Sequence, residues 1–467
     1  MWNKESLEQA LKNNIISSSV KPKTEILNIN IDSRKQNKSP LFIAIRGENN
    51  DGHKYLQQAI ENGAKILIVE KSPEYTDKNL QIIKVKDSQK ALIDLATYNR
   101  NRFQGKVIGI TGSVGKTSTK EMLKNILSKK YKIFANEGNL NNHIGMPLSL
   151  ANLDPSVKYC ILEMGMNHLK EIEFLSKIAK PNISIISNIA AAHIGNFNNE
   201  QEIAQAKSEI FIGAPKNSQV ILNKDSIYYD FLTKQAIKFN IEPDDIISFS
   251  KNTPSNVNLT SFAHVNEGMS KINANINDQE INYNINSINE ATISNSTIIL
   301  AILVALKENI SQFLDFFQEI QPIKGRGNIV QGIKNIKIID DSYNANLTSV
   351  IAGLQFLSEL KKQHKNSRSI AIIGDMLELG EESTNQHKLI AKYIDEFNID
   401  HAILVGNLTK NTALELKKGQ ILGQFENSQD LSQNIENLTR ENDILLIKGS
   451  RGMKMELVIN NLIQKPC

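Results

Sequence analysis

The sequence predicts an α/β protein built of three domains, and three observations support this fold class. With 467 residues the chain is long enough for two to four domains of usual size. Short apolar runs alternate with amphipathic helical patterns along its middle, as in a parallel sheet covered by helices. The same alternation restarts at about residue 326. We therefore expect a small N-terminal α/β domain at 1–100, a central parallel-sheet domain at 101–325 and a C-terminal Rossmann-like domain at 326–467.

Apolar runs place the elements of the first two domains. The N-terminal segment has strand-like runs at 41–45 and 66–69 among helical stretches. For the central segment we expect strands at 107–110, 159–162, 183–189 and 219–222, and helices at 116–130, 200–213 and 291–307. Between 257 and 287 polar and apolar residues alternate and Asn is frequent, which predicts short antiparallel strands.

The last segment repeats the strand and helix alternation. Strand-like runs occur at 336–340, 369–374, 402–406, 420–425 and 443–447. In an open α/β sheet, ligands bind beyond the carboxyl ends of the strands. Three of these strands are followed directly by polar residues or glycine: Asp341, the pair Gly374 and Asp375, and the run Lys448 to Arg451. We expect them to lie at a binding site.

Composition excludes several classes of protein. Lys and Arg exceed Asp and Glu by 54 to 50, and a net charge of +4 is too weak to indicate a nucleic-acid partner. The two cysteines, Cys160 and Cys467, are far apart, so they predict neither a disulfide framework nor a Cys-based zinc site. The N-terminus is polar, and the longest apolar run, Ile298 to Leu306, is too short to span a membrane. We expect a soluble cytoplasmic protein with no membrane partner, and by default a monomer.

A phosphate-binding loop is predicted between residues 107 and 117. The run VIGITGSVGKT places two glycines between a strand and a helix start, so backbone N–H groups can close around phosphate oxygens. Lys116 supplies a positive charge and Thr117 a hydroxyl for Mg²⁺. The run departs from a strict Walker A pattern, which requires glycine where Ile110 stands. A glycine-rich turn without nucleotide is the alternative. We predict a P-loop ATPase domain, although the loop alone does not identify the reaction.

Three further side chains are candidates for chemistry. Glu163 ends an apolar strand, where an acid that holds Mg²⁺ is typically found in phosphate-loop proteins. His193 follows another apolar strand. Lys207 lies four residues after Ile203 and four before Phe211, on the core-facing stripe of its helix. Each also has a structural interpretation: a helix-capping carboxylate, a packed histidine, and a lysine whose tip reaches water.

Four motifs in this order resemble the Mur ligases, a family of ATP-dependent enzymes that join a carboxylate to an amine. They are Thr111 to Thr117, Gly138 to Pro147, Glu163 to Met166 and Ala192 to Gly195, and the likeness extends over nearly the whole chain. The resemblance implies ATP and Mg²⁺ as cofactors, and catalytic roles for Lys116, Lys207 and His193. It implies metal ligands at Thr117, Glu163, His193 and Lys207, the last of which is carbamylated in relatives.

The resemblance also implies substrate contacts in the outer domains. Asp32 to Arg34, with 41–47 and 51–53, is similar to the segment that grips a uridine nucleotide. The implied ATP contacts are Thr111, Gly112, Ser113, Gly115, Lys116, Thr117, Ser118, Asn295, Arg326, Asp341, Tyr343 and Asn344. The implied substrate contacts are Ser33, Arg34, Asn139, Asn141, Asn142, Asn346, Asp375 and Glu378. Two departures from the family pattern stand out: Ala291 and Thr292 replace family residues before Asn295 and leave the adenine contacts open, and Ser39-Pro40 replaces a Gly-Asp pair at a turn.

Motifs of the last segment resemble the branch of the family that adds a dipeptide. They are Asp340 to Asn346, Gly374 to Gly380 and Lys448 to Arg451. The implied substrates are UDP-N-acetylmuramoyl-tripeptide and D-alanyl-D-alanine, joined through an acyl phosphate. The third tripeptide residue, meso-diaminopimelate or L-lysine, stays open. The alternatives are a sister ligase that adds one amino acid, a regulatory P-loop NTPase and a non-catalytic scaffold.

Overall fold

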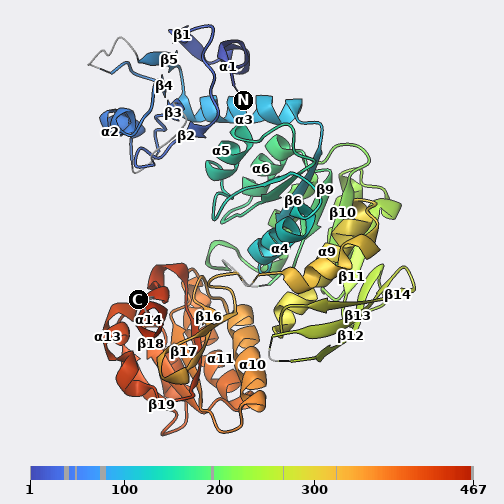
Figure 1. The fold of residues 1–467 in the computed structure, drawn as a ribbon, viewed down its shortest axis with the longest axis vertical. Coiled ribbons are helices and arrows are strands. Elements are labelled where there is room, and N and C mark those ends of the chain that lie inside the picture. The colour runs from blue at the N-terminus through green and yellow to red at the C-terminus, as the bar shows by residue number, and fades with distance from the viewer. Residues whose placement is uncertain are drawn as a thin grey trace.

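The fold was analysed in a computed structural model, which describes residues 2–35, 41–47, 50–73, 80–190, 194–266, 268–321 and 323–463. The described residues form three sheets, of five, nine and six strands. Figure 1 shows the sheets following one another from the N-terminus to the C-terminus, each with its own helices. The predicted α/β fold class is confirmed.

The N-terminal sheet has the strand order β1-β5-β4-β3-β2. Its elements are α1 (Lys4–Leu11), β1 (Ile15–Ser18), β2 (Ile29–Asn30), β3 (Leu41–Ile43), α2 (Leu56–Glu61), β4 (Ile66–Val69), β5 (Gln81–Val85) and α3 (Ser88–Arg102). Strand β4 is ILIV and wholly buried, as expected for a parallel strand covered on both faces. Helix α3 contacts strand β4 of the N-terminal sheet and helix α5, which packs on the central sheet. It therefore joins the N-terminal sheet to the central sheet.

The central sheet has the order β14-β13-β12-β11-β10-β9-β6-β8-β7. Its elements are β6 (Lys106–Thr111), α4 (Lys116–Ser128), β7 (Ile133–Ala135), α5 (Gly145–Ala151), β8 (Tyr159–Glu163), α6 (Glu171–Ala179), β9 (Ile183–Ile186), α7 (Glu200–Ser208), β10 (Gln219–Asn223), α8 (Tyr229–Lys238), β11 (Ile246–Ser250), β12 (Val257–His264), β13 (Ser270–Ile276), β14 (Gln279–Ile285) and α9 (Glu290–Ala305). The predicted antiparallel strands are present, and they extend the parallel sheet because β12 pairs in parallel with β11.

Helices cover both faces of the central sheet. Successive side chains of a strand point to opposite faces, and accordingly Ile108 packs with α4 and α9 whereas Val107 packs with α5 to α8. The apolar side chains of α4 and α9 meet the sheet on one face. This arrangement leaves the carboxyl ends of the strands free to carry loops.

The C-terminal sheet has the order β15-β16-β20-β17-β18-β19. Its elements are β15 (Asn328–Gln331), β16 (Lys337–Asp341), α10 (Leu347–Gln363), β17 (Ser369–Gly374), α11 (Ser383–Glu396), β18 (His401–Val405), α12 (Lys410–Glu415), β19 (Ile421–Phe425), α13 (Ser428–Leu438), β20 (Ile444–Lys448) and α14 (Glu456–Leu462). All five predicted strands are present. The structure adds β15, a half-exposed antiparallel edge strand that the apolar pattern did not reveal.

Short 3₁₀ helices complete the fold at Gly52–Tyr55, Ile194–Asn196, Glu209–Phe211, Pro243–Asp245, Ile310–Gln312, Leu314–Glu319, Ile333–Asn335, Gly380–Glu382 and Arg451–Met453. The helix predicted at 200–213 therefore ends at Ser208 and tightens into a 3₁₀ turn. Within the described residues, no helix has the length and apolar character needed to cross a bilayer.

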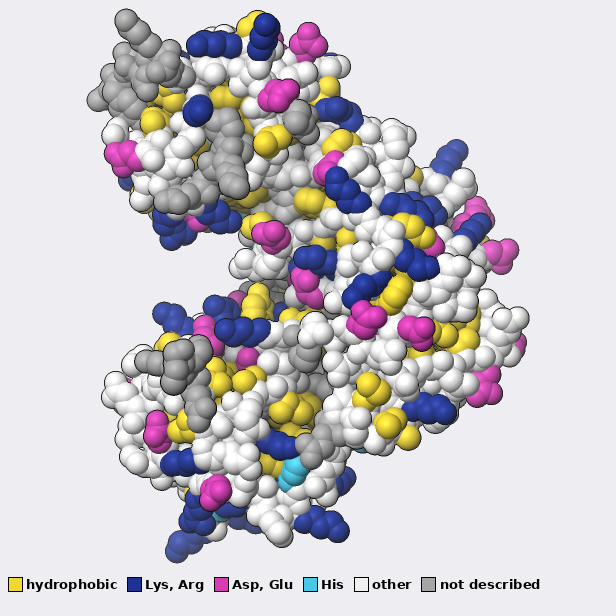
Figure 2. All heavy atoms as spheres, in the orientation of Figure 1, with side chains coloured by type: hydrophobic (Ala, Val, Ile, Leu, Met, Phe, Trp, Pro, Cys, Tyr) yellow, Lys and Arg dark blue, Asp and Glu magenta, His cyan; other side chains and the backbone are white. Residues whose placement is uncertain are grey.

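Figure 2 shows a wide hollow that opens at the left between the N-terminal and C-terminal parts of the molecule, with the central part at its inner end and Lys and Arg side chains on both of its edges.

Candidate active site

The phosphate-binding loop connects β6 to α4, as predicted. Gly112 and Gly115 have φ angles of 151° and 88°, where glycine is favoured. A Cβ atom on Gly112 would lie 2.0 Å from Ser187 Oγ. Lys116 Nζ donates a hydrogen bond to the Gly112 carbonyl at 2.6 Å, across the loop. Burial lowers the pKa of Lys116, while Glu163 raises it in part.

The chain that follows β9 braces this loop from behind. Ser113 N donates to the Asn188 carbonyl at 2.8 Å, and Ser113 Oγ donates to the Ala190 carbonyl at 2.8 Å. Ser187 Oγ donates to the Val114 carbonyl at 2.6 Å. Hydrogen bonds to the residues that follow β9 thus fix the conformation of the loop. In that conformation its backbone can bind an anion.

Glu163 lies at the end of β8 and is 2% exposed. Its Oε1 accepts a hydrogen bond from Asn141 Nδ2 at 2.8 Å. Its Oε2 is buried and has no hydrogen-bond partner among the described residues. A buried carboxylate oxygen without a partner is unusual. Oxygen ligands of this kind, with a threonine hydroxyl, are those that Mg²⁺ prefers, so Glu163 and Thr117 fit a magnesium site.

His193 and Ala192 lie outside the described residues. In the described part of the chain, no group of three or more His, Cys, Asp or Glu side chains gathers as a metal cluster.

Sequence reasoning missed two residues behind Glu163. Lys120 on α4 is fully buried, and its Nζ donates to the Asn136 carbonyl at 2.8 Å. It also lies 3.0 Å from Glu121 Oε1 and 4.0 Å from Glu163 Oε2. Asn136 Oδ1 in turn accepts from Glu163 N at 2.9 Å. Lys120 precedes Leu123 by three residues, and this shared helix face was the signal that would have found it.

Lys207 lies on α7 and is 2% exposed, as its place on the apolar stripe predicted. Among the described residues it has no hydrogen bond or ion pair. Burial first, and then the charge of Lys116, hold the pKa of Lys207 well below its usual range. Burial and the positive charge of Lys116 thus both favour the uncharged form of this amine over the ammonium form.

Two predicted ATP contacts bring the central and C-terminal sheets together. Arg326 Nη2 donates to Thr117 Oγ1 at 3.1 Å, and its guanidinium lies 4.3 Å from the centre of the Tyr343 ring. A Cβ atom placed on Gly115 would lie 3.1 Å from Asn295 Oδ1, so the Asn295 side chain borders the phosphate loop. Beside them lies a cavity of about 720 Å³, bordered by Thr117, Ser118, Arg326, Tyr343 and a series of apolar side chains.

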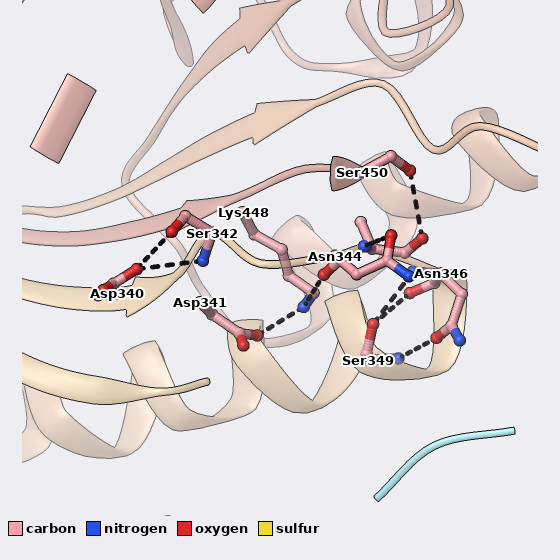
Figure 3. Close-up of polar contacts among 9 residues, drawn as sticks. Asp340, Asp341, Ser342, Asn344, Asn346, Ser349, Lys448 and Ser450 are labelled. Carbon is pink, nitrogen blue, oxygen red and sulfur yellow. Dashed lines mark hydrogen bonds and ion pairs between the residues drawn. The ribbon is translucent and has the colours of Figure 1, made fainter. Parts of the chain in front are cut away.

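Asp341 and Asn344 are tied to the end of β20. Lys448 Nζ lies 2.6 Å from Asp341 Oδ2 and donates to the Asn344 carbonyl at 3.0 Å (Figure 3). Burial raises the pKa of Asp341, and the charge of Lys448 opposes that rise. The charge of Arg326 also opposes the rise in the pKa of Asp341, so Asp341 lies within the electrostatic reach of the side chain that bonds Thr117.

The residues predicted to contact the dipeptide form hydrogen bonds within the protein. Asn346 caps α10, since its Oδ1 accepts from Ser349 N at 2.9 Å. The Asp375 carboxylate accepts hydrogen bonds from the backbone N–H groups of Asn407, Leu408 and Thr409 at 3.1, 3.0 and 2.9 Å. The Asn346 and Asp375 side chains thus shape their loops. Glu378 is exposed, and its carbonyl accepts from Gly195 N at 3.2 Å.

The predicted substrate residues of the other sheets are placed as follows. Ser33 Oγ donates to Gln58 Oε1 at 2.7 Å, and the exposed Arg34 pairs with Asp32 at 2.9 Å. Asn139 is exposed, whereas Asn142 Oδ1 accepts from Gly145 N at 2.8 Å at the start of α5. The structure therefore gathers Lys116, Glu163, Lys207, Asn295 and Arg326 around the phosphate loop and leaves the Ser33 loop on a separate sheet.

Sequence models of one family match three segments of the chain. The Mur ligase family catalytic domain matches residues 25–100, the Mur ligase middle domain residues 110–305, and the Mur ligase glutamate ligase domain residues 325–451. The chain belongs to the Mur ligase family. Its phosphate loop lies in the middle family segment, and Arg326, Asp341 and Lys448 lie in the last one. The family resemblance of the motifs is thereby confirmed.

Individual Mur ligases resemble this one along their whole length. The UDP-N-acetylmuramoyl-tripeptide–D-alanyl-D-alanine ligase of Rickettsia prowazekii is 37% identical over 461 residues, covering 98% of this chain and 99% of that protein. The Escherichia coli ligase of the same name is 30% identical, with 93% of each chain covered. A crystal structure of MurF from Acinetobacter baumannii has a TM-score of 0.87 at 29% identity, with 99% of each chain covered. MurF of Thermotoga maritima, solved with ADP, shares the fold with a TM-score of 0.77 at 24% identity, over 93% of this chain and 96% of that one.

Proposed function

We propose that this Mur ligase joins D-alanyl-D-alanine to UDP-N-acetylmuramoyl-tripeptide, with release of ADP and phosphate. The observation that carries the proposal is the likeness to ligases of that name over nearly the full length of both chains. The phosphate loop beside Glu163, Lys207 and Arg326 supplies a site suited to the chemistry.

The reaction needs an activated carboxylate. A free carboxylate is anionic and offers a poor leaving group, so an amine does not attack it readily. Transfer of the γ-phosphoryl group of ATP to a carboxylate oxygen makes an acyl phosphate and releases ADP. The amine of D-alanyl-D-alanine then attacks the acyl carbon, loses a proton to solvent, and expels phosphate as the amide forms.

The residues around the phosphate loop have distinct parts in this scheme. Lys116 and Arg326 offset the negative charge that gathers when ATP and the substrate carboxylate approach each other. Glu163 and Thr117, with His193, would hold Mg²⁺, which neutralises phosphate charge when bound. The apolar wall of the 720 Å³ cavity suits the adenine ring. Docking of the C-terminal domain would exclude water from the acyl phosphate.

Lys207 is proposed to act as a carbamate. Its neutral amine attacks CO₂ to form a C–N bond, and a proton passes to solvent, which leaves an anionic carboxylate on the side chain. This change turns a buried amine that has no hydrogen bond or ion pair among the described residues into an oxygen ligand for the metal site, beside the positive charge of Lys116. A mass spectrum at saturating bicarbonate that shows an unmodified amine would count against it.

The outer domains complete the proposal. The loop at Ser33 and Arg34, with Asn139, Asn141 and Asn142, serves the UDP-linked acceptor, and the region around Asn346, Asp375 and Glu378 serves the dipeptide. The proposed domain limits are 1–100, 101–325 and 326–467. We further propose a monomer in the cytoplasm, where a reducing environment suits a chain with two distant cysteines.

The test is phosphate release by the purified protein with ATP, Mg²⁺, the UDP-linked tripeptide and D-alanyl-D-alanine, together with the mass of the product. The proposal requires a product heavier by one dipeptide less water. Phosphate release with a single amino acid instead would identify a sister ligase, and release without any amine would identify a regulatory NTPase. The same assay with each tripeptide identifies the third residue.

A further inference from the structure

Strand β20 lies between β16 and β17 in the C-terminal sheet. It runs parallel to both, so its carboxyl end lies beside theirs. The loop after β16, residues 341–346, carries proposed nucleotide contacts, and the loop after β17, residues 375–380, carries proposed dipeptide contacts. The segment 448–450 at the end of β20 thus lies between two loops that serve different substrates.

Lys448 makes the contacts on one side. Its side chain is 2% exposed, and its Nζ bonds both the Asp341 carboxylate at 2.6 Å and the Asn344 carbonyl at 3.0 Å (Figure 3). Lysines are rarely buried this deeply without a charged partner. An ionised carboxylate facing ATP would repel its phosphates, and the ammonium cancels that charge. The second bond fixes the turn that leads to α10.

Ser450 makes the contacts on the other side. Its Oγ accepts a hydrogen bond from Leu377 N at 2.8 Å, and its N donates to the Asp375 carbonyl at 3.1 Å. The same hydroxyl points back to the Ala345 carbonyl at 3.5 Å, a long contact that Figure 3 shows. One buried hydroxyl therefore reaches both loops.

We infer that Lys448 and Ser450 are positioning residues of the proposed reaction. Lys448 holds the 341–346 loop in place for ATP, Ser450 holds the 375–377 loop in place for the dipeptide, and together they fix the distance between the two substrates. Neither side chain touches a reacting atom. The inference rests on the proposed function, because that function assigns a substrate to each loop.

Steady-state kinetics of two single variants test this division of roles. Ser450→Ala removes the acceptor of Leu377 N, and the KM for D-alanyl-D-alanine rises about tenfold while the KM for ATP stays within about twofold. Lys448→Met leaves Asp341 unpaired, and the KM for ATP rises about 10- to 100-fold. Equal changes in both KM values for Ser450→Ala, or none for Lys448→Met, would overturn the inference.

A double-mutant cycle tests whether Lys448 acts through Asp341. Removing both partners of a buried pair costs less than removing one. The rise in the KM for ATP caused by Lys448→Met is therefore smaller in the Asp341→Asn background than in the wild type, by about threefold or more. Effects that multiply instead would show that Lys448 acts independently, and the inference would fail.

Hydrogen exchange gives a readout that does not depend on activity. In the ligand-free protein, Ser450→Ala speeds exchange of the Leu377 amide about tenfold or more, because that amide loses its acceptor. Unchanged exchange there would overturn the inference even if wild-type activity is as proposed. If wild-type protein releases no phosphate with D-alanyl-D-alanine, the proposed function fails, and exchange still reports on the loop contacts.

Matched controls separate positioning from stability. Ser432→Ala removes a buried hydroxyl that bonds within α13, and Lys361→Met removes a lysine paired with Asp400 away from the site. Both controls keep the two KM values of the wild type. If Ser450→Ala behaves like Ser432→Ala in every assay, Ser450 has only a structural role.

Discussion

Lys120 offers the sharpest test of how the metal site is held, and the variant is Lys120→Met, which keeps the length of the side chain and removes its charge. The ammonium donates to the Asn136 carbonyl at 2.8 Å and lies 4.0 Å from Glu163 Oε2, which accepts no hydrogen bond from the described residues. Opposite charges 4 Å apart interact by about 4 kcal/mol at an effective dielectric constant of about 20. Breaking a buried pair from one side costs about 3–5 kcal/mol. We therefore expect Lys120→Met to lower the free energy of local opening around Glu163 by that amount.

The amide of Glu163 reports this loss directly, because it donates to Asn136 Oδ1. A change of about 3–5 kcal/mol in the free energy of local opening speeds hydrogen exchange at that amide by a factor on the order of 10²–10⁴. With Mg²⁺ and a non-hydrolysable ATP analogue, the metal replaces the missing charge. The acceleration then falls to about 10- to 100-fold, which is the part caused by losing the hydrogen bond from Lys120 to the Asn136 carbonyl.

Two results would refute this reasoning. The first is an acceleration below about tenfold in the ligand-free protein, which would mean that Lys120 contributes little to Glu163. The second is an equal acceleration with and without Mg²⁺ and nucleotide, which would mean that the charge of Lys120 is irrelevant there. Lys124→Met is the matched control, since Lys124 is an exposed lysine on the same helix.

Three further variants test other parts of the structure. Asp375→Asn weakens the acceptor of the N–H groups at 407–409, and in urea denaturation we expect the C-terminal domain to lose about 1.5–3 kcal/mol. His387 Nε2 accepts a hydrogen bond from Met376 N at 3.0 Å, and burial lowers the pKa of His387 in the folded protein. As the pH falls below about 6.5, this histidine therefore binds a proton in the unfolded chain before it does so in the folded protein. Acidification therefore lowers the Tm of the wild type through that site, and His387→Gln has a smaller drop in Tm between pH 7.5 and 5.5. Arg326→Lys loses the planar fork that bonds the phosphate loop and stacks on a tyrosine ring, so the KM for ATP rises about tenfold in steady-state assays.

Each variant has a control of the same chemical type at an exposed position: Asp430→Asn, His168→Gln and Arg440→Lys. An unfolding midpoint unchanged in Asp375→Asn would contradict the cost assigned to its loop. Identical acid sensitivity of His387→Gln and wild type would show that another group controls the pH response. A normal KM for ATP in Arg326→Lys would remove Arg326 from the nucleotide site.

Local patterns predicted the parts of the fold that depend on neighbours in sequence. The glycine run between β6 and α4 and the buried parallel strands were placed within a few residues, because a strand covered on both faces must be apolar throughout. Pairing across the sheet was not predictable in this way. Nothing within 257–264 indicates that β12 pairs in parallel with β11, and β15 has alternating half-exposed residues at an edge.

The site shows the same limit. Lys207 was found because a lysine on an apolar helix stripe is conspicuous, and the same reasoning applied to α4 would have found Lys120. Asn346 carries a local signal as well, since Ser349 completes a capping box. Asp375 carries none: its three donors come from residues 407–409, after the next strand, and only the tertiary fold brings them together.

Arg326 explains why the phosphate loop alone does not make this site. Its guanidinium joins Thr117 of the central sheet to the Tyr343 ring of the C-terminal sheet. Gly325 and Gly327 on either side have left-handed φ angles of 76° and 78°, and a Cβ on Gly327 would lie 2.6 Å from Asn289 Nδ2. Larger residues are therefore strained beside Arg326. Because one side chain must reach two sheets from a tightly turned linker, the site is complete only where the two domains meet, and neither domain by itself determines the reaction.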